Sequence, residues 1–183
     1  MSTWKKTALG MIALAAALLV STLQPPVAEM QDEGPARFAG TYTLKGSASQ
    51  AEQKIEEALE RGVQDVNFAI RGLALSRLKA KNPLINSVKI EYRNNKFKVT
   101  FDGSRSYESP ADGSLQNQRD VQGDRIRVGH RVNRGRLQQI FVSESGRRVN
   151  TFSLDGNTLR MNVRVTADIL PSAVTYRVDY QKQ

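Results

Sequence analysis

Few side chains in this sequence have the types and spacing that chemistry requires. His130 is the only histidine and there is no cysteine, which excludes thiol redox chemistry and thiolate metal sites and argues against a zinc site. A Ser–His–Asp triad is formally open, but no nucleophile-elbow sequence is present. Asp120 and Asp124 are more typical of a turn than of a catalytic pair. We therefore expect no catalytic residues, no metal and no cofactor, and a protein that is not an enzyme.

Two polar side chains fall on the apolar faces of predicted strands. His130 alternates in register with Ile126 and Val128, which predicts either a hydrogen-bonded core histidine or a ligand contact. Arg148 shares a face with Phe152. An arginine near a strand end could lie at the mouth of a barrel and pair with an acidic head group. Alternatively, a bulge reverses the face and Arg148 is solvated.

Three tyrosines complete the set of candidate ligand contacts. Tyr92 shares the apolar face of a predicted hairpin, and Tyr176 and Tyr180 alternate with apolar residues in the last predicted strand. We expect these tyrosines to be core residues first and ligand contacts second. The candidate ligand-binding residues are Tyr92, His130, Arg148, Tyr176 and Tyr180.

The chain is basic, with a net charge of +9 from 27 Lys and Arg against 18 Asp and Glu. Several arginines alternate with apolar residues along predicted strands and should face outward together. Such a surface would attract an anionic membrane, a glycan or another polyanion. Ordinary solubility and protection of sheet edges explain it equally well. No nucleic-acid-binding motif is visible, so nucleic acid is a disfavoured partner. The candidate anion-binding residues are Arg125, Arg127, Arg131, Arg160 and Arg164.

The N-terminus has the features of a secretory signal. Lys5 and Lys6 precede the uncharged run Ala8–Val20, which is shorter than a membrane-spanning helix. The sequence predicts a signal peptide over 1–28 with cleavage after Ala28, and the alternative is an uncleaved N-terminal anchor. Residues 29–36 would form a flexible mature N-terminus. We therefore expect a periplasmic or secreted protein.

Residues 37–183 have the length of a single domain that can bury a core of its own. One helical stretch, Ser49–Lys81, interrupts a sequence of strands. Ser49 and Glu52 have the spacing of a capping box, while Gly62 and Gly72 are weak points at which the stretch could divide into two shorter helices. The apolar positions recur at three- and four-residue steps, which is typical of an amphipathic helix. They are Ile55, Leu59, Val63, Val66, Ile70 and Leu73.

The second half of this helical stretch is more apolar than the first. Phe68 and Leu75 widen the apolar stripe there. A wide stripe predicts a helix that is packed on more than one side. We expect this half to pack against the sheet, where Val66, Ile70 and Leu73 would fill space that a ligand could otherwise occupy.

The clearest local pattern is a hairpin. Ser87–Arg93 and Lys96–Phe101 flank Asn94 and Asn95, and asparagine tolerates the positive φ that a two-residue turn demands. Pairing Arg93 with Lys96 places all the apolar side chains on one face, so the turn and the alternation agree on the register. The expected pairs are Tyr92 with Phe97, Ile90 with Val99 and Val88 with Phe101.

The rest of the sequence alternates between strands and turns. The fold class is mainly β, with about ten antiparallel strands in a meander that forms a barrel or a strongly curved sheet. One long amphipathic helix, or two short ones, follows the first strand, Phe38–Leu44. The later strands are expected at Arg105–Glu108, Leu115–Val121, Arg125–Val132, Leu137–Ser143, Arg147–Leu154, Thr158–Ala167 and Ala173–Lys182.

This pattern resembles the lipocalin and fatty-acid-binding (calycin) barrels. The segment Phe38–Leu44 is similar to their first strand, which favours Phe-x-Gly-x-Trp, with Tyr42 at the tryptophan position. The order of strand, helix and meander is also similar. In that group an Arg-x-Tyr pair near the C-terminus often holds a carboxylate. Here Arg177 and Tyr180 are three apart and fall on opposite faces, so that site is not transferred.

The resemblance implies an exported, non-enzymatic, lipocalin-like protein that binds a hydrophobic or amphipathic small molecule of the lipid or fatty-acid class. The alternative function is that of a cell-envelope interaction protein, which would bind anionic lipid, a glycan or a protein partner through the basic surface. The volume and the lining of the interior separate the two hypotheses.

Overall fold

The computed structural model describes residues 34–120 and 122–183. The predicted signal peptide and the predicted mature N-terminus up to residue 33 lie outside the described residues. None of the helices in the described part of the chain is long and apolar enough to cross a lipid bilayer.

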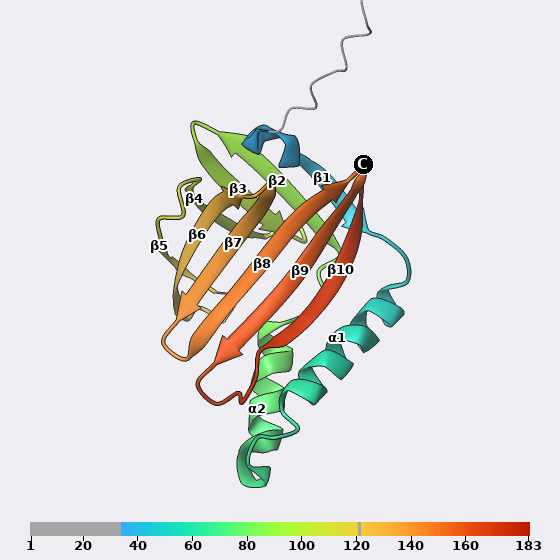
Figure 1. Ribbon diagram of the computed structural model, residues 1–183, viewed down its shortest axis with the longest axis vertical. Helices are drawn as coiled ribbons and strands as arrows, with labels where there is room; N and C mark the ends of the chain where they lie inside the picture. Colours follow the sequence, from blue (N-terminus) through green and yellow to red (C-terminus); the bar gives the residue numbers. More distant parts are fainter. Residues whose placement is uncertain (1–33, 121) are drawn as a thin grey trace, which may run out of the picture. The chain divides into compact units, whose positions relative to one another are not determined.

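Ten antiparallel strands form one sheet that curves into a nearly closed barrel (Figure 1). The two end strands of the sheet, β4 and β5, are bridged by Gln118, whose Nε2 donates to the carbonyl oxygen of Glu108 at 2.7 Å. The predicted strand count is confirmed. The strands are β1 (Gly40–Leu44), β2 (Ser87–Arg93), β3 (Lys96–Phe101), β4 (Arg105–Pro110), β5 (Gln116–Arg119), β6 (Arg125–Asn133), β7 (Arg136–Ser143), β8 (Gly146–Asp155), β9 (Thr158–Ala167) and β10 (Val174–Lys182).

The predicted hairpin is confirmed residue by residue. Strands β2 and β3 pair Tyr92 with Phe97, and the two pairs that follow are also those expected from the sequence. Asn94 and Asn95 have φ values of 50° and 57°, as a two-residue turn between twisted strands requires. Local turn chemistry and side-chain alternation were therefore sufficient to fix this register.

The helical stretch consists of two helices, α1 (Ala48–Gly62) and α2 (Phe68–Lys81). The alternative of two short helices is thus the correct one. The predicted capping box at Ser49 is wrong, because α1 begins two residues earlier and its N-cap is Ser47, which accepts from the backbone N–H of Gln50 at 3.5 Å. The Ser-x-x-Gln spacing of these residues is itself a capping-box pattern.

The prediction that the second half of the stretch packs deeply against the sheet is correct only in part. Val66 is buried and Leu75 packs against the core, as expected. Phe68 and Leu73 are 87% and 57% exposed, and Ala74 is the buried residue of α2. The prediction assumed one straight helix, but the chain changes direction between α1 and α2. As a result Ala74 is buried, whereas Leu73 lies at the exposed rim of the space between α2 and the barrel.

The first strand begins at Gly40 rather than at Phe38, because residues Pro35–Phe38 form a 3₁₀ helix, η1. Phe38 is nevertheless fully buried, and its carbonyl oxygen accepts a hydrogen bond from the Tyr42 hydroxyl at 3.0 Å. Arg37 donates to the carbonyl oxygen of Gly135 in the β6–β7 turn. We call this end of the barrel the closed end. The opposite end, beside α2, is the mouth (Figure 1).

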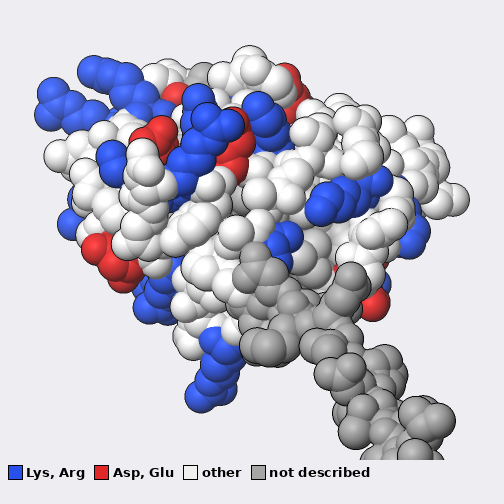
Figure 2. Space-filling model, turned by 90° about the horizontal axis from the view of Figure 1, so that it is seen from above, with Lys and Arg blue, Asp and Glu red and all other residues white. Residues whose placement is uncertain are grey.

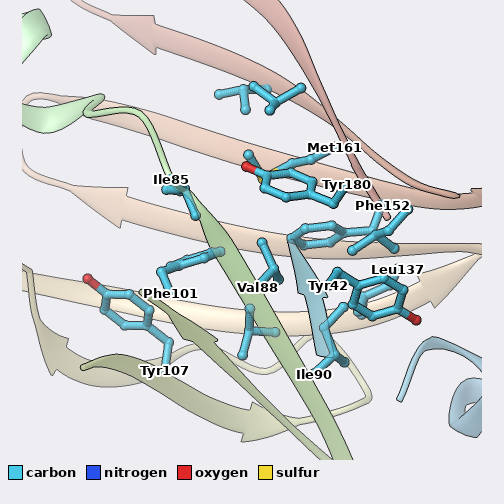
Figure 3. Close-up of a cluster of buried hydrophobic side chains, with 14 of the residues drawn as sticks. Tyr42, Ile85, Val88, Ile90, Phe101, Tyr107, Leu137, Phe152, Met161 and Tyr180 are labelled. Atoms are coloured by element: carbon cyan, nitrogen blue, oxygen red, sulfur yellow. The ribbon is translucent and has the colours of Figure 1, made fainter. Parts of the chain in front are cut away.

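The core fills the closed end and thins toward the mouth. Tyr42, Leu137 and Phe152 gather on one side of the close-up in Figure 3, and Phe101 and Tyr107 lie on the other. The first three have no accessible surface, whereas the last two retain a few per cent. Side chains at the closed end are thus completely enclosed by protein, and the first accessible side chains lie near the mouth.

Candidate ligand-binding site

The register of β6 to β10 arranges the inward side chains in cross-strand rows. The first of three rows, near the mouth, contains Val128, Phe141, Arg148, Val165 and Val174. The next row contains His130, Gln139, Asn150, Val163 and Tyr176. The third row contains Val132, Leu137, Phe152, Met161 and Val178. The barrel wall is therefore apolar toward the closed end, polar in the middle and mixed at the mouth.

A cavity of about 260 Å³ lies at the mouth, between α2 and the inner wall of the barrel. Its apolar lining comes from α2, from the segment after it and from the first row of the wall. These residues include Leu78, Ile85, Phe101, Tyr107, Phe141 and Val165. A largely apolar concave site with a few polar groups is the kind that binds small molecules. A second, more open groove between β4 and β5 is polar, with Lys96, Glu108 and Gln118 among its lining residues.

The end of α2 is fastened over this cavity. Lys81 Nζ lies 3.0 Å from Asp120 Oδ2 and 2.9 Å from Asp124 Oδ2, and Gln122 Nε2 donates to the carbonyl oxygen of Ala80 at 3.0 Å. Burial raises the pKa of Asp120, but the hydrogen bonds from Lys81 and from two backbone N–H groups outweigh it, so the pKa is lowered overall. Asp120 and Asp124 are therefore turn residues, as expected, and also anchors for the helix.

Positive charge dominates the rim of the cavity. The single acidic residue in its lining, Asp120, is paired with Lys81, and Arg105 is paired with Asp102. The other three cations of the lining form no ion pair within residues 34–120 and 122–183. They are Arg77, Arg147 and Arg148. An acidic ligand would therefore meet unpaired arginines at the mouth.

Arg148 is the unpaired arginine that faces the barrel interior. Strand β8 pairs continuously with β7 and β9 around it, so the bulge that would have turned Arg148 outward does not occur. Its side chain is half-buried, with Nε donating to Asn150 Oδ1 at 2.9 Å and Nη1 donating to the carbonyl oxygen of Lys81 at 3.1 Å. Both acceptors are neutral, and the guanidinium has further donors to offer.

Three residues of the second row and Ser109 of β4 form a polar belt, by which we mean Ser109, His130, Gln139 and Asn150. Ser109 Oγ and His130 Nδ1 are 2.7 Å apart, and Asn150 Nδ2 donates to Gln139 Oε1 at 3.1 Å. Burial lowers the pKa of His130 to about 4, so the imidazole is neutral near pH 7. His130 Nε2 and Gln139 Nε2 have no hydrogen-bond partner within the described part of the protein. His130, Gln139 and Asn150 are fully buried and are absent from the cavity lining.

Of the five predicted ligand contacts, only Arg148 lines the cavity. Tyr92 lies at the closed end, with its ring centroid 4.8 Å from that of Phe97 and its hydroxyl donating to Asn95 Oδ1 at 3.0 Å. Tyr176 donates to Asn82 Oδ1 at 3.2 Å, at the end of α2. Burial raises the pKa of Tyr176, and the charge of Arg148 opposes that rise.

The remaining two predicted contacts are core residues. Tyr180 is fully buried, and its hydroxyl has no hydrogen-bond partner in the described structure. His130 lies in the polar belt, as the alternative of a hydrogen-bonded core histidine predicted. Gln139 was missed, although it alternates with Leu137 and Phe141 in the same way that His130 alternates with its neighbours. The alternation with apolar residues that placed His130 on an inner face therefore also places Gln139 there.

The predicted basic surface does face outward. Arg125, Arg127, Arg131 and Arg164 are exposed, whereas Arg160 is partly buried and lies 3.5 Å from Asp179 Oδ1. Seen from the closed end, Lys and Arg side chains are spread around the surface and are interrupted by a few acidic ones (Figure 2). The outward orientation is confirmed, and binding of an anionic surface stays a prediction.

No family model and no curated protein matches this sequence. Solved structures do match. A secretory abundant heat soluble protein from Ramazzottius varieornatus has a TM-score of 0.53 at 13% identity, over 80% of this chain and 95% of the other. The fatty acid binding protein of Schistosoma mansoni, in complex with arachidonic acid, has a TM-score of 0.50 at 17% identity, over 80% and 96%. The fluorescent protein UnaG has a TM-score of 0.51 at 11% identity, over 80% and 98%.

The fold is that of the calycin β-barrels. Within this barrel, the expected departure from the Arg-x-Tyr pair near the C-terminus is confirmed. Tyr180 points into the core, whereas Arg177 is exposed and lies 3.6 Å from Asp179 Oδ1. The two residues do not form a joint site, and the cationic group on the inner wall is Arg148 instead.

Proposed function

We propose that this calycin barrel binds a hydrophobic or amphipathic small molecule of the lipid or fatty-acid class in the mouth cavity, and that it is a binding protein rather than an enzyme. The observation that carries the proposal is the apolar cavity of about 260 Å³ with an unpaired, half-buried arginine, Arg148, on its wall. The solved structures of similar fold include proteins described as fatty acid binding or transporting, which supports the same class of ligand.

The cavity offers an amphiphile two kinds of contact. Apolar groups entering it leave water and contact Phe101, Phe141 and Val165, and burial of apolar surface contributes roughly 25 cal/mol per Å². An acidic head group can accept charge-assisted hydrogen bonds from Arg148, and such bonds are stronger than neutral ones. Arg148 is already held in place by Asn150 and by the Lys81 carbonyl, so little side-chain entropy is lost on binding.

Filling the cavity tests the location of the site. Val165 lines the cavity and is almost fully buried, so Val165→Phe should lower the affinity for decanoic acid at least tenfold, measured by displacement of a fluorescent naphthalene-sulfonate probe. Asn162→Phe, on the outer face of the same strand, is the matched control and should bind as the native protein does. Native affinity in Val165→Phe would place the site elsewhere, and no binding by the native protein would refute the proposal.

Removing the arginine tests the class of head group. Arg148→Met should lower the affinity for decanoic acid about tenfold and leave that for decanol within about twofold, because only the acid gains from a charge-assisted bond. Arg125→Met, on the outer wall, is the control for the loss of one positive charge. An equal loss for acid and alcohol would show that Arg148 acts through packing alone.

We also propose that the protein is exported to the periplasm or secreted, with residues 1–28 removed as a signal peptide. The support is the charged segment and the uncharged run at the N-terminus of the sequence. N-terminal sequencing of the protein recovered from the exported fraction should begin at Glu29. Recovery of the full-length chain in the membrane fraction would favour the uncleaved anchor instead.

A further inference from the structure

We infer that the binding site is confined to the mouth and selects short amphiphiles, with the polar belt as the floor that keeps longer chains out of the closed end. This inference rests on the proposed function and deepens it, because it specifies the length of ligand that the cavity admits. Three observations carry it: the closed end is filled, the belt lies directly beneath the cavity, and the cavity is small.

The closed end has no room for a ligand. Four side chains that point into it from four strands are 0% exposed: Leu137, Phe152, Leu159 and Tyr180. These side chains are therefore in contact with protein on all sides. η1 closes the same end, where Phe38 is also fully buried. A long chain could enter this region only by displacing packed side chains, and overpacking a core is destabilising.

The polar belt separates this filled region from the cavity. Gln139 lies between Leu137 and Phe141 on the inner face of β7, and Phe141 lines the cavity whereas Gln139 does not. On the side of the barrel formed by β6 to β8, an alkyl chain that passed the belt would have to separate Asn150 from Gln139 or contact the buried nitrogens of His130 and Gln139. Neither exchange gives a buried polar group a new partner, so both are unfavourable. The belt therefore resists an apolar chain chemically as well as sterically.

The volume of the cavity sets the length of the chain. The volume of about 260 Å³ is slightly below the roughly 300–1,000 Å³ that is typical of small-molecule sites. It therefore suits a head group on Arg148 and a chain of medium length beneath α2. The remaining carbons of a longer chain would lie at the open side of the mouth, near the exposed Leu73 of α2.

A series of straight-chain acids from hexanoic to palmitic acid, each below its micelle concentration, tests the inference by isothermal titration calorimetry. Affinity should rise about fourfold with each added methylene up to about decanoic acid and then level off, so that palmitic acid binds within about threefold of decanoic acid. A continued fourfold rise to palmitic acid would overturn the inference while leaving the proposed function intact. Failure of every acid to bind would refute the proposed function itself.

Substitution in the belt tests its role as the floor. Gln139→Ala removes volume and a polar group beneath the cavity and should move the levelling point to longer acids, so that palmitic acid gains at least tenfold. Gln138→Ala is the matched control, because Gln138 is the next residue on the same strand and contacts Arg131 on the outside. If Gln139→Ala does not fold, His130→Ala replaces it. An unchanged levelling point in a folded belt variant would show that the belt is not the floor.

Discussion

Leu137 and Phe141 lie four residues apart on the inner face of β7, and only the second lines a cavity. The same contrast holds along β8, where Phe152 is packed at the closed end and Arg148 faces the cavity at the mouth. The strands are continuous through both regions, so backbone geometry does not cause the difference. It comes from side chains: large residues and η1 fill one end, whereas the other is covered by a helix that contributes little packing.

The two helices repeat this contrast. α1 buries Ile55 and Leu59, and Gly62 fits so closely against β10 that an added Cβ would lie 2.1 Å from Val174 Cγ2. α2 leaves Phe68 and Leu73 exposed and buries only Ala74, with Leu78 partly buried. Polar contacts fasten its C-terminal end. α1 is thus part of the core, whereas α2 is a cover. The part of the barrel that is free to hold a ligand is the part that contributes least to stability.

The largest difference in stability is expected when one phenylalanine at each end of the barrel is replaced by alanine. Phe152→Ala should lower the free energy of unfolding by about 3–5 kcal/mol, because the cavity that it leaves is enclosed on all sides. Phe141→Ala should cost only about 1–2 kcal/mol, since its ring is already partly exposed. Urea unfolding followed by circular dichroism measures both. Equal losses would mean that the mouth is as tightly packed as the closed end.

The polar belt between the two regions should make stability depend on pH. Burial lowers the pKa of His130 from 6.5 to about 4. Between pH 6.5 and pH 4, His130 is therefore protonated in the unfolded chain and neutral in the folded chain. The stability contributed by neutral His130 is complete above pH 6.5 and is lost as the pH falls to 4, a difference of about 3 kcal/mol. Unfolding curves between pH 7 and pH 4 measure it. The same slope in His130→Gln would assign it to other groups.

Replacing glycine by alanine should change the stability of the protein in opposite directions in the two helices. Gly62→Ala places a methyl group against the buried Val174 and should destabilise the protein by about 1–3 kcal/mol. Gly72→Ala in α2 meets nothing within 4 Å and should stabilise the protein by about 0.5–1 kcal/mol, because glycine is a poor helix former. Thermal unfolding of both variants provides the measurement. Destabilisation by Gly72→Ala would show that α2 is packed more closely than its exposure suggests.

The smallest effect on stability is expected at the outer wall, which belongs to neither region. Charge reversal at Arg125, Arg127 and Arg131 should change the free energy of unfolding by less than about 0.5 kcal/mol, because all three are exposed. If the wall binds anionic surfaces, the variant should sediment less with phosphatidylglycerol vesicles at low salt, with phosphatidylcholine vesicles as the control. Unchanged sedimentation would remove the alternative function.

Much of the barrel could be predicted from the sequence, because strand alternation and turn chemistry are local. The β2–β3 register follows from two asparagines and six apolar side chains, and nearly all strand ends were placed to within two residues. Arg125 faces outward and His130 faces inward because successive side chains of a strand point to opposite faces of the sheet. Arg148 was identified as a residue on the apolar face, but the sequence left its direction open.

What the sequence could not determine depends on how elements pack. A continuous apolar stripe predicted a deeply packed second helix, but the chain changes direction after α1, so Leu73 is 57% exposed at the rim of the cavity. Whether the interior is filled or hollow depends on which side chains meet across the barrel. The alternation of side chains along a single strand does not predict these contacts. The sequence by itself determined the strands, their register and their inner faces, because these are set by neighbours in the chain. Only the tertiary structure decided that the closed end is full, that the mouth is open and that Arg148 lines the cavity there, because these depend on contacts between residues distant in sequence.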